Sequence, residues 1–206
     1  MPAFKSTKTI CGSRDKGRPG MSVLAIYGSS RRHGNTELLA DRVVEGLPVE
    51  KIYLIEKPVR PIEDRRHDPG GFARVDDDYD FVIERVMAHD TLVFATPVYW
   101  YGMSGLMKNF IDRWSQSLRD PRYDFRQVMG KKSACVVLVG GDDPRIKALP
   151  LVEQFRYIFD FMGMRFTGYV VGEANRPGDI LSDAAAMYEA SLLNARLRQS
   201  APDSVS

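Results

Sequence analysis

The sequence predicts an α/β protein built on a doubly wound, five-stranded parallel sheet with strand order 2-1-3-4-5. Short apolar runs alternate with stretches of helical period along the chain, which is typical of successive β-α units. Several runs are apolar throughout rather than at every second residue, as expected for strands covered on both faces. A length of 206 residues with 44% hydrophobic side chains suits one domain with a substantial core.

Five apolar runs of strand length are expected to form the sheet. In chain order they cover residues 23–27, 49–55, 91–96, 134–139 and 166–171. Five apolar stripes at helical spacing are expected to cover its two faces. They lie within residues 39–47, 82–87, 103–114, 151–162 and 184–197. Strand order reverses between the first and third strands, so a ligand is expected beyond the carboxyl ends of those two strands.

The loop after the first strand is dense in hydrogen-bond donors and reads GSSRRHGNT over residues 28–36. An anion docks at the start of a helix because unpaired N–H groups and the positive dipole end lie there. Arg31 or Arg32 would add charge. Asn35 or Thr36 alone would explain a capped turn, but two serines and two arginines favour an anion site. The loop matches neither the P-loop nor the dinucleotide fingerprint, which disfavours both ligand classes.

The loop after the third strand is unusually aromatic. Pro97 is expected to end strand pairing, and Gly102 to turn the chain into the next helix. The aromatic residues 99–101 are either core or subunit-interface residues, or a wall for a flat aromatic ligand. Their position at the switch point favours the ligand. Gly140 and Gly141 follow the fourth strand, where they allow close approach of the backbone to a ligand.

A phosphate loop, an aromatic wall and a Gly-Gly loop together resemble the flavodoxin-like NAD(P)H-dependent FMN reductases and quinone oxidoreductases. The branch is the one near iron–sulfur flavoproteins and multimeric flavodoxins. Residues 28–36 and 96–114 carry the resemblance, which extends from about residue 21 to the last helix. It implies a flavodoxin-like fold, FMN as cofactor, and NADH or NADPH as co-substrate. Hydride would pass through FMN to a small acceptor such as a quinone, a nitroaromatic or a flavin.

The resemblance also implies site residues and an assembly. The phosphate would be held by Ser29, Arg31, Asn35 and Thr36. The flavin ring would lie along Pro97, Val98, Tyr99, Trp100, Gly102 and Met103, with Gly140 and Gly141 near its far edge. No catalytic side chain and no metal site is assigned. A homodimer or homotetramer is implied, with the flavins near subunit contacts.

One departure from the iron–sulfur relatives concerns the long polar segment 56–71, where those proteins carry a compact cysteine motif. This segment has no cysteine, and the two cysteines of the chain, Cys11 and Cys135, are far apart. A flavin-only protein is therefore expected. The segment itself is a solvated surface loop, a lid over the flavin or a subunit contact, and the sequence leaves these alternatives open.

Charge is distributed unevenly along the chain. The net charge is +2, but residues 1–20 carry +4 and the remainder carries −2. We expect residues 1–20 to be a disordered N-terminal extension and residues 21–200 to be the FMN-binding domain. A nearly neutral domain disfavours the alternative of an acidic, flavodoxin-type electron carrier, and a plain flavin-binding module is the other alternative. No nucleic-acid or membrane partner is expected, and a cytoplasmic location follows from the lack of a secretory pattern.

Overall fold

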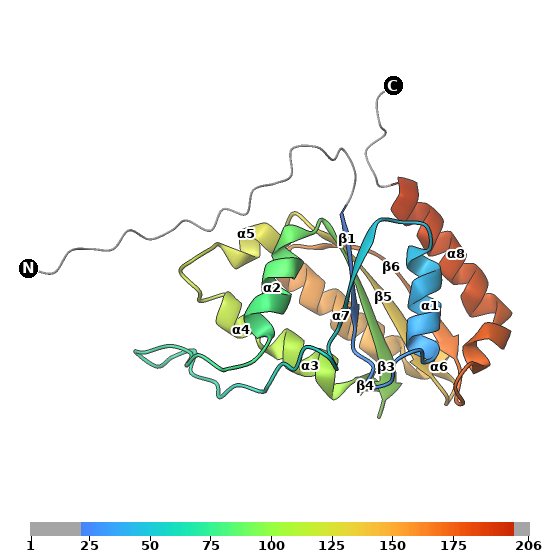
Figure 1. The fold of residues 1–206 in the computed structure, drawn as a ribbon, viewed down its shortest axis with the longest axis horizontal. Helices are drawn as coiled ribbons and strands as arrows, with labels where there is room; N and C mark the ends of the chain where they lie inside the picture. Colours follow the sequence, from blue (N-terminus) through green and yellow to red (C-terminus); the bar gives the residue numbers. More distant parts are fainter. Residues whose placement is uncertain (1–21, 200–206) are drawn as a thin grey trace, which may run out of the picture.

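A computed structural model describes residues 22–199, which form three layers with a twisted sheet in the middle (Figure 1). The parallel strands are β1 (Val23–Tyr27), β2 (Val49–Tyr53), β3 (Thr91–Tyr99), β5 (Ser133–Gly140) and β6 (Arg165–Glu173). Their order is β2-β1-β3-β5-β6, and a two-residue strand β4 (Gly102–Met103) pairs antiparallel with β3. The predicted order 2-1-3-4-5 is confirmed, and it is the flavodoxin-like order.

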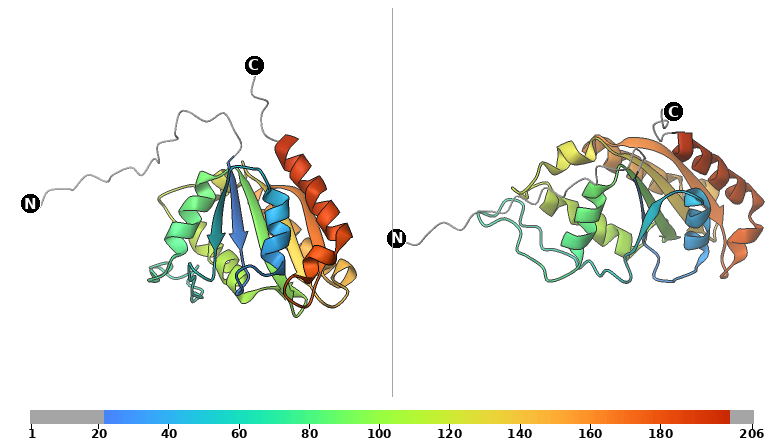
Figure 2. Two further views of the ribbon diagram at one scale, coloured as in Figure 1. Left: turned by 45° about the vertical axis from the view of Figure 1, so that its right-hand side comes forward. Right: turned by 45° about the horizontal axis from the view of Figure 1, so that its top comes forward.

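Helices cover both faces of the sheet, as Figure 2 shows. One face packs against α1 (Asn35–Val44), η1 (Asp179–Ser182) and α8 (Ala184–Gln199). The other face packs against α2 (Tyr79–Ala88), α3 (Gly105–Asp112), α4 (Trp114–Ser117), α5 (Phe125–Met129) and α7 (Leu149–Met162). The short α6 (Pro144–Lys147) follows β5 and lies against β6 and α7. None of the helices in the described part of the chain is long and apolar enough to cross a membrane.

The uniformly apolar strands are explained by two separate cores. In β3, Leu92 and Phe94 belong to the core under α2, α3 and α7, whereas Val93 and Ala95 belong to the core under α1 and α8. Successive side chains of a strand point to opposite faces, so a sheet covered on both sides needs an apolar residue at every position. The buried Cys135 of β5 is one of these core residues, and its burial raises the pKa of the thiol to about 12.

The expectation that Pro97 ends strand pairing is wrong. β3 continues to Tyr99, and Pro97 is in register with Val139 of β5. The carbonyl of Ala95 accepts a bond from Gly28 N–H on the β1 side, so the position of Pro97, two residues on, faces that side too. Because β1 has already ended there, the missing N–H of the proline removes no ladder bond.

Other expected boundaries shift by a few residues. β2 ends at Tyr53 rather than at residue 55, because the chain turns there with Glu56 N–H donating to Tyr53 O. The stripe 103–114 is divided at Arg113 between α3 and α4. The expected extension 1–20 lies outside the described residues.

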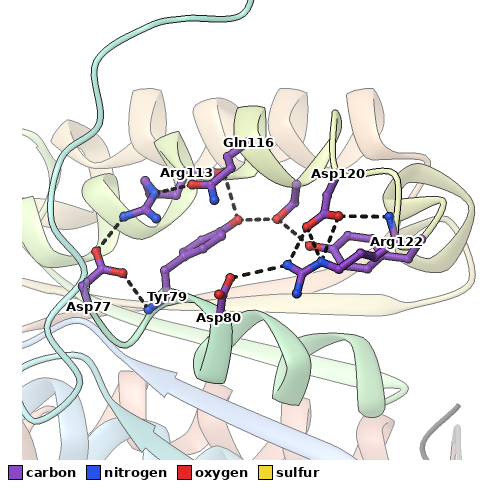
Figure 3. Close-up of polar contacts among 9 residues, drawn as sticks. Asp77, Tyr79, Asp80, Arg113, Gln116, Asp120 and Arg122 are labelled. Carbon is purple, nitrogen blue, oxygen red and sulfur yellow. Dashed lines mark hydrogen bonds and ion pairs between the residues drawn. The ribbon is translucent and has the colours of Figure 1, made fainter. Parts of the chain in front are cut away.

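A buried ion pair anchors the long polar loop 54–78 at its base (Figure 3). Arg113 Nη1 lies 2.6 Å from Asp77 Oδ2, and both side chains are 1% exposed. Arg60 donates its backbone N–H to Asp77 and accepts a bond from Arg113 on its carbonyl. The Arg113 guanidinium also lies 4.4 Å from the ring centre of Tyr79. The two ends of the loop are therefore joined to α2 and α3, whereas its tip, from residue 63 to 70, is exposed.

Candidate functional site

Three loops meet at the carboxyl edge of the sheet, because β1, β3 and β5 are neighbours and parallel. The first two are joined by hydrogen bonds. Ser104 N–H donates to Thr96 Oγ1 over 3.0 Å, and Ser104 Oγ donates to the carbonyl of Gly28. The predicted convergence of the segments after the first, third and fourth parallel strands is therefore confirmed.

Gly28 is required by this convergence. A Cβ atom on Gly28 would lie 3.0 Å from Met107 Cβ and 3.1 Å from Ser104 Oγ. Ser104 is also the N-cap of α3, where its hydroxyl accepts a bond from Met107 N–H. The absence of a side chain at residue 28 thus lets the start of α3 pack directly against the end of β1.

The loop between β1 and α1 leaves the helix without a side-chain cap. Gly34 is the N-cap residue of α1 and makes no cap bond, so Asn35 and Thr36 are helical residues rather than caps. The first N–H groups of a helix have no partner within it, and here no side chain replaces one. Ser29 is buried and its Oγ accepts a bond from Arg31 N–H over 3.1 Å. These groups form a donor-rich turn of the kind that binds an anion.

The two arginines of the loop have different surroundings. The Arg32 guanidinium lies 3.4 Å from the ring centre of Tyr53, pairs with Glu56 and lies 3.6 Å from Glu37. The guanidinium of the exposed Arg31 makes no ion pair or hydrogen bond within residues 22–199. From charge alone, the sequence left Arg31 and Arg32 as equal candidates for binding an anion. The structure distinguishes them, because Arg32 already has carboxylate partners and Arg31 has none in the described residues.

Asn35 has a second role that the sequence did not reveal. Its Nδ2 donates to Arg176 O, and its Oδ1 accepts from Gly178 N–H and Ile180 N–H. The side chain therefore ties α1 to η1 and to the residues just before it. Thr36 lies beside it and is 4% exposed.

Next to the loop lies a partly buried acid–tyrosine cluster that sequence reasoning missed. Glu37 Oε1 accepts a bond from Tyr53 OH, and Asp41 Oδ1 accepts one from Tyr27 OH over 2.6 Å. The two rings stack with centroids 4.6 Å apart. Burial, and then the bond to Glu37, raises the pKa of Tyr53 to about 12, and the pKa of Tyr27 is raised further still by burial and Asp41. Both phenols therefore stay neutral donors.

The β3–β4 hairpin has a strained tip. Its two central residues, Trp100 and Tyr101, have φ values of +50° and +63°, as a type I′ turn requires. Such turns favour Asn and Gly because bulky residues strain the backbone at positive φ. Tyr101 OH donates to Asp142, and Asp142 in turn pairs with Lys147 of α6 at 2.6 Å. The tip is thereby joined to the loop after β5.

A cavity of about 160 Å³ lies between this hairpin and the loop after β5. Four of the predicted site residues line it, namely Val98, Trp100, Gly140 and Gly141. The remaining lining residues are Tyr101, Asp142, Pro144, Lys147 and Ala148. Except for Tyr101, which belongs to the aromatic run, these come from the loop and helix after β5, where paired glycines were the only signal in the sequence.

Gly140 is constrained in the same way as Gly28. A Cβ atom there would lie 3.1 Å from Pro144 Cβ and 3.3 Å from Val98 Cβ, so a side chain would fill the floor of the cavity. Gly141 is exposed at its rim.

The other predicted ring contacts lie around the cavity rather than in its wall. Pro97 is buried within β3, and Met103 is 8% exposed and packs into the core under α3. Tyr99 is half-exposed on the hairpin, and Gly102 begins β4. Trp100, by contrast, lines the cavity but is 96% exposed, so its ring contacts little of its own chain.

Comparison with known proteins agrees with this geometry. The profile of the family described as NADPH-dependent FMN reductase matches residues 21–175. The chain is 58% identical over 174 residues to the putative NAD(P)H-dependent FMN-containing oxidoreductase YwqN of Bacillus subtilis, with 84% of this chain and 96% of that protein covered. An iron–sulfur flavoprotein of Methanocaldococcus jannaschii is 33% identical over 105 residues, which are 48% of this chain and 54% of that protein.

Among solved structures, the Trp repressor binding protein from Bacillus subtilis superposes with a TM-score of 0.71 at 50% identity, with 83% of this chain and 96% of that chain covered. The resemblance carried by residues 28–36 and 96–114 is thus confirmed. The chain belongs to the NADPH-dependent FMN reductase family.

Proposed function

We propose that this chain is an FMN-dependent oxidoreductase that transfers reducing equivalents from NADH or NADPH to a small acceptor such as a quinone, a nitroaromatic or a flavin. FMN and a nicotinamide follow from membership of the family. The observation that carries the proposal is the meeting of an uncapped helix start, a strained aromatic hairpin and a Gly-Gly loop at one sheet edge.

The residues present fit the phosphate end of FMN. The start of α1 offers backbone donors without a competing cap, and Ser29 lies beside it. Arg31 is the cation of this loop that has no carboxylate partner in the described part of the chain. A phosphate dianion bound there would gain charge-assisted hydrogen bonds without displacing an existing ion pair.

The cavity fits one edge of a flat ring rather than a whole cofactor. Its volume of about 160 Å³ is below the roughly 300–1,000 Å³ of ordinary ligand pockets. We propose that Val98, Trp100 and the two glycines, Gly140 and Gly141, lie along that edge. One ring face would then stay open to the substrates.

When bound, FMN supplies the redox chemistry by accepting hydride from the nicotinamide and passing it to the acceptor. The chain's own residues position the reactants. Hydrogen bonds from Lys147 and Tyr101 lower the pKa of the Asp142 carboxyl, and the bond to Asp142 raises the pKa of the Tyr101 phenol. Asp142 therefore stays ionised and Tyr101 stays neutral near pH 7, so this trio holds the hairpin in place and contributes no mobile proton.

The enzyme proposal is tested by anaerobic reduction and by steady-state kinetics. FMN-loaded protein should lose its flavin absorbance when NADH or NADPH is added without oxygen. Because donor and acceptor would use the same open ring face in turn, double-reciprocal lines at several fixed acceptor concentrations should be parallel. Protein that neither nicotinamide reduces, but that a protein donor does reduce, would favour the electron-carrier alternative.

The phosphate site is tested by Arg31→Ala. Loss of one charge-assisted bond, worth about 1.5–3 kcal/mol, should weaken FMN binding roughly ten- to a hundredfold. Riboflavin lacks the phosphate and should bind parent and variant equally weakly. Equal FMN affinity in parent and variant would place the phosphate elsewhere.

A homodimer or homotetramer is part of the proposal. Tyr99, Trp100 and Tyr101 lie exposed on the β3–β4 hairpin, and exposed apolar groups of this kind mark interaction surfaces. Light scattering at micromolar concentration should give a mass of two or four chains, and a monomer would contradict this. A cytoplasmic location remains a prediction that fractionation of the native cell would test.

A further inference from the structure

We propose that Glu37 is a positioning residue for the phosphate loop: its buried carboxylate fixes the backbone of residues 28–36 in the shape that receives FMN. This inference rests on the proposed function, because it assigns a role within the proposed phosphate site. It does not make Glu37 a ligand of the phosphate, which a carboxylate would repel.

The carboxylate of Glu37 lies at the centre of the loop's contacts. It is 6% exposed, although Glu is rarely buried without partners. One oxygen accepts the backbone N–H of His33, and the other accepts Tyr53 OH over 3.0 Å. The contact therefore connects the loop to strand β2, through a side chain that α1 itself carries.

The His33 contact matters because of the backbone conformation at that residue. His33 has a φ of +56°, which is unfavourable for a residue with a side chain. The left-handed residue turns the chain into Gly34, after which α1 begins. A hydrogen bond to the N–H of His33 compensates for this conformation, and the first N–H groups of the helix then face the loop.

The charge arrangement supports the same assignment. Arg32 is held over the Tyr53 ring between Glu37 and Glu56, so it offsets the charge of the buried carboxylate. Glu37 also lies in the first turn of α1, where a negative charge is favourable to the helix dipole. The loop can thus contain an acid close to an anion site because that acid is already paired.

The test compares FMN with riboflavin, since only FMN reports on the phosphate loop. Apoprotein would be titrated with each flavin for the parent, Glu37→Ala, Glu37→Gln and Asp41→Ala. Asp41 is the matched control, because it lies one turn further along α1 and bonds Tyr27 but does not contact residues 28–36.

Glu37→Ala should weaken FMN binding by roughly tenfold or more and leave riboflavin binding within about twofold, since a loop that is no longer preorganised loses affinity for the group it holds. Glu37→Gln should recover most of the FMN affinity, because its amide oxygen still accepts the His33 N–H. Asp41→Ala should keep the parental ratio of FMN to riboflavin affinity.

Equal losses for both flavins in Glu37→Ala, or an unchanged ratio, would overturn the inference. If Glu37→Ala does not fold by circular dichroism, Glu37→Asp serves instead, because the shorter side chain withdraws the carboxylate from His33 while retaining the charge; an unchanged ratio there would also overturn it. A parent that binds both flavins equally would remove the phosphate site and this inference together. Parental selectivity that survives in Glu37→Ala would remove this inference alone.

Discussion

Replacing Trp100 by Asn should stabilise the protein while changing its choice of acceptor. Trp100 has a φ of +50° at the tip of the β3–β4 hairpin, where a bulky residue is strained by roughly 1–2 kcal/mol. Asn adopts this conformation more readily, because its short polar side chain bonds locally. The indole is 96% exposed, so its removal costs almost no burial.

The expected gain is therefore about 1 kcal/mol in the free energy of unfolding, which corresponds to a rise in Tm of roughly 2–4 °C for a domain of this size. Differential scanning calorimetry should be done on apoprotein, since bound FMN would itself raise the Tm. The same variant, loaded with FMN, should show altered kcat/KM ratios between a quinone and a nitroaromatic, because Trp100 lines the proposed ring cavity.

Tyr99→Asn is the matched control. Tyr99 is the neighbouring hairpin residue, but it is an ordinary strand residue paired with Gly102, so no strain is relieved there. The Tyr99→Asn variant should have a Tm equal to or lower than that of the parent. A Trp100→Asn variant with the parental Tm or a lower one would refute the strain argument. If Trp100→Asn is more stable but keeps the parental kcat/KM ratios between acceptors, the proposal that Trp100 influences the choice of acceptor would be refuted.

Three further outcomes follow from other contacts. Asp77→Ala should lower the free energy of unfolding by about 3–5 kcal/mol because it leaves Arg113 charged, buried and unpaired, and Asp77→Ala with Arg113→Met should recover much of it in urea titrations; an unaffected single variant would show the pair to be dispensable. Burial lowers the pKa of Lys132 to about 8, so the unfolded chain binds more protons between pH 8 and about 10.4 and stability should rise with pH across that window. Lys132→Met should lose this part of the pH dependence, and identical slopes in both proteins would contradict it. Gly28→Ala should cost roughly 1–3 kcal/mol because its Cβ would lie 3.0 Å from Met107 Cβ, and a variant as stable as the parent would show that α3 moves aside freely.

Much of the fold was readable from local sequence, and the reason is periodicity. Residues 92–95 of β3 and 134–139 of β5 are apolar at every position, which is typical of strands covered on both faces. Alternation with helical stripes then leaves few topologies, because parallel strands need crossover connections of one hand. The loops after the first, third and fourth strands could be brought to one edge on that basis alone.

The same local signals indicated the site but not the function of each side chain. The donors of residues 28–36 are recognisable because a helix start and its preceding loop are contiguous in sequence. Whether Arg31 or Arg32 is available depends on Tyr53 and Glu56, which come from another strand and its turn. The partners of Asn35 lie more than 140 residues away.

Tertiary structure decided the remaining features because they depend on which distant segments of the chain lie next to each other. Pro97 is tolerated in a central strand since β1 stops before reaching it. Arg113 can be buried between α3 and α4 because its charge is paired with Asp77 across the base of a loop. From the sequence, Glu37 is an acidic residue in the first turn of a helix, where a negative charge is favourable. Only the fold brings its carboxylate to the backbone N–H of His33 and the hydroxyl of Tyr53. Periodicity specifies which face of an element is buried, whereas the partner of a buried polar group is chosen by packing between segments distant in sequence.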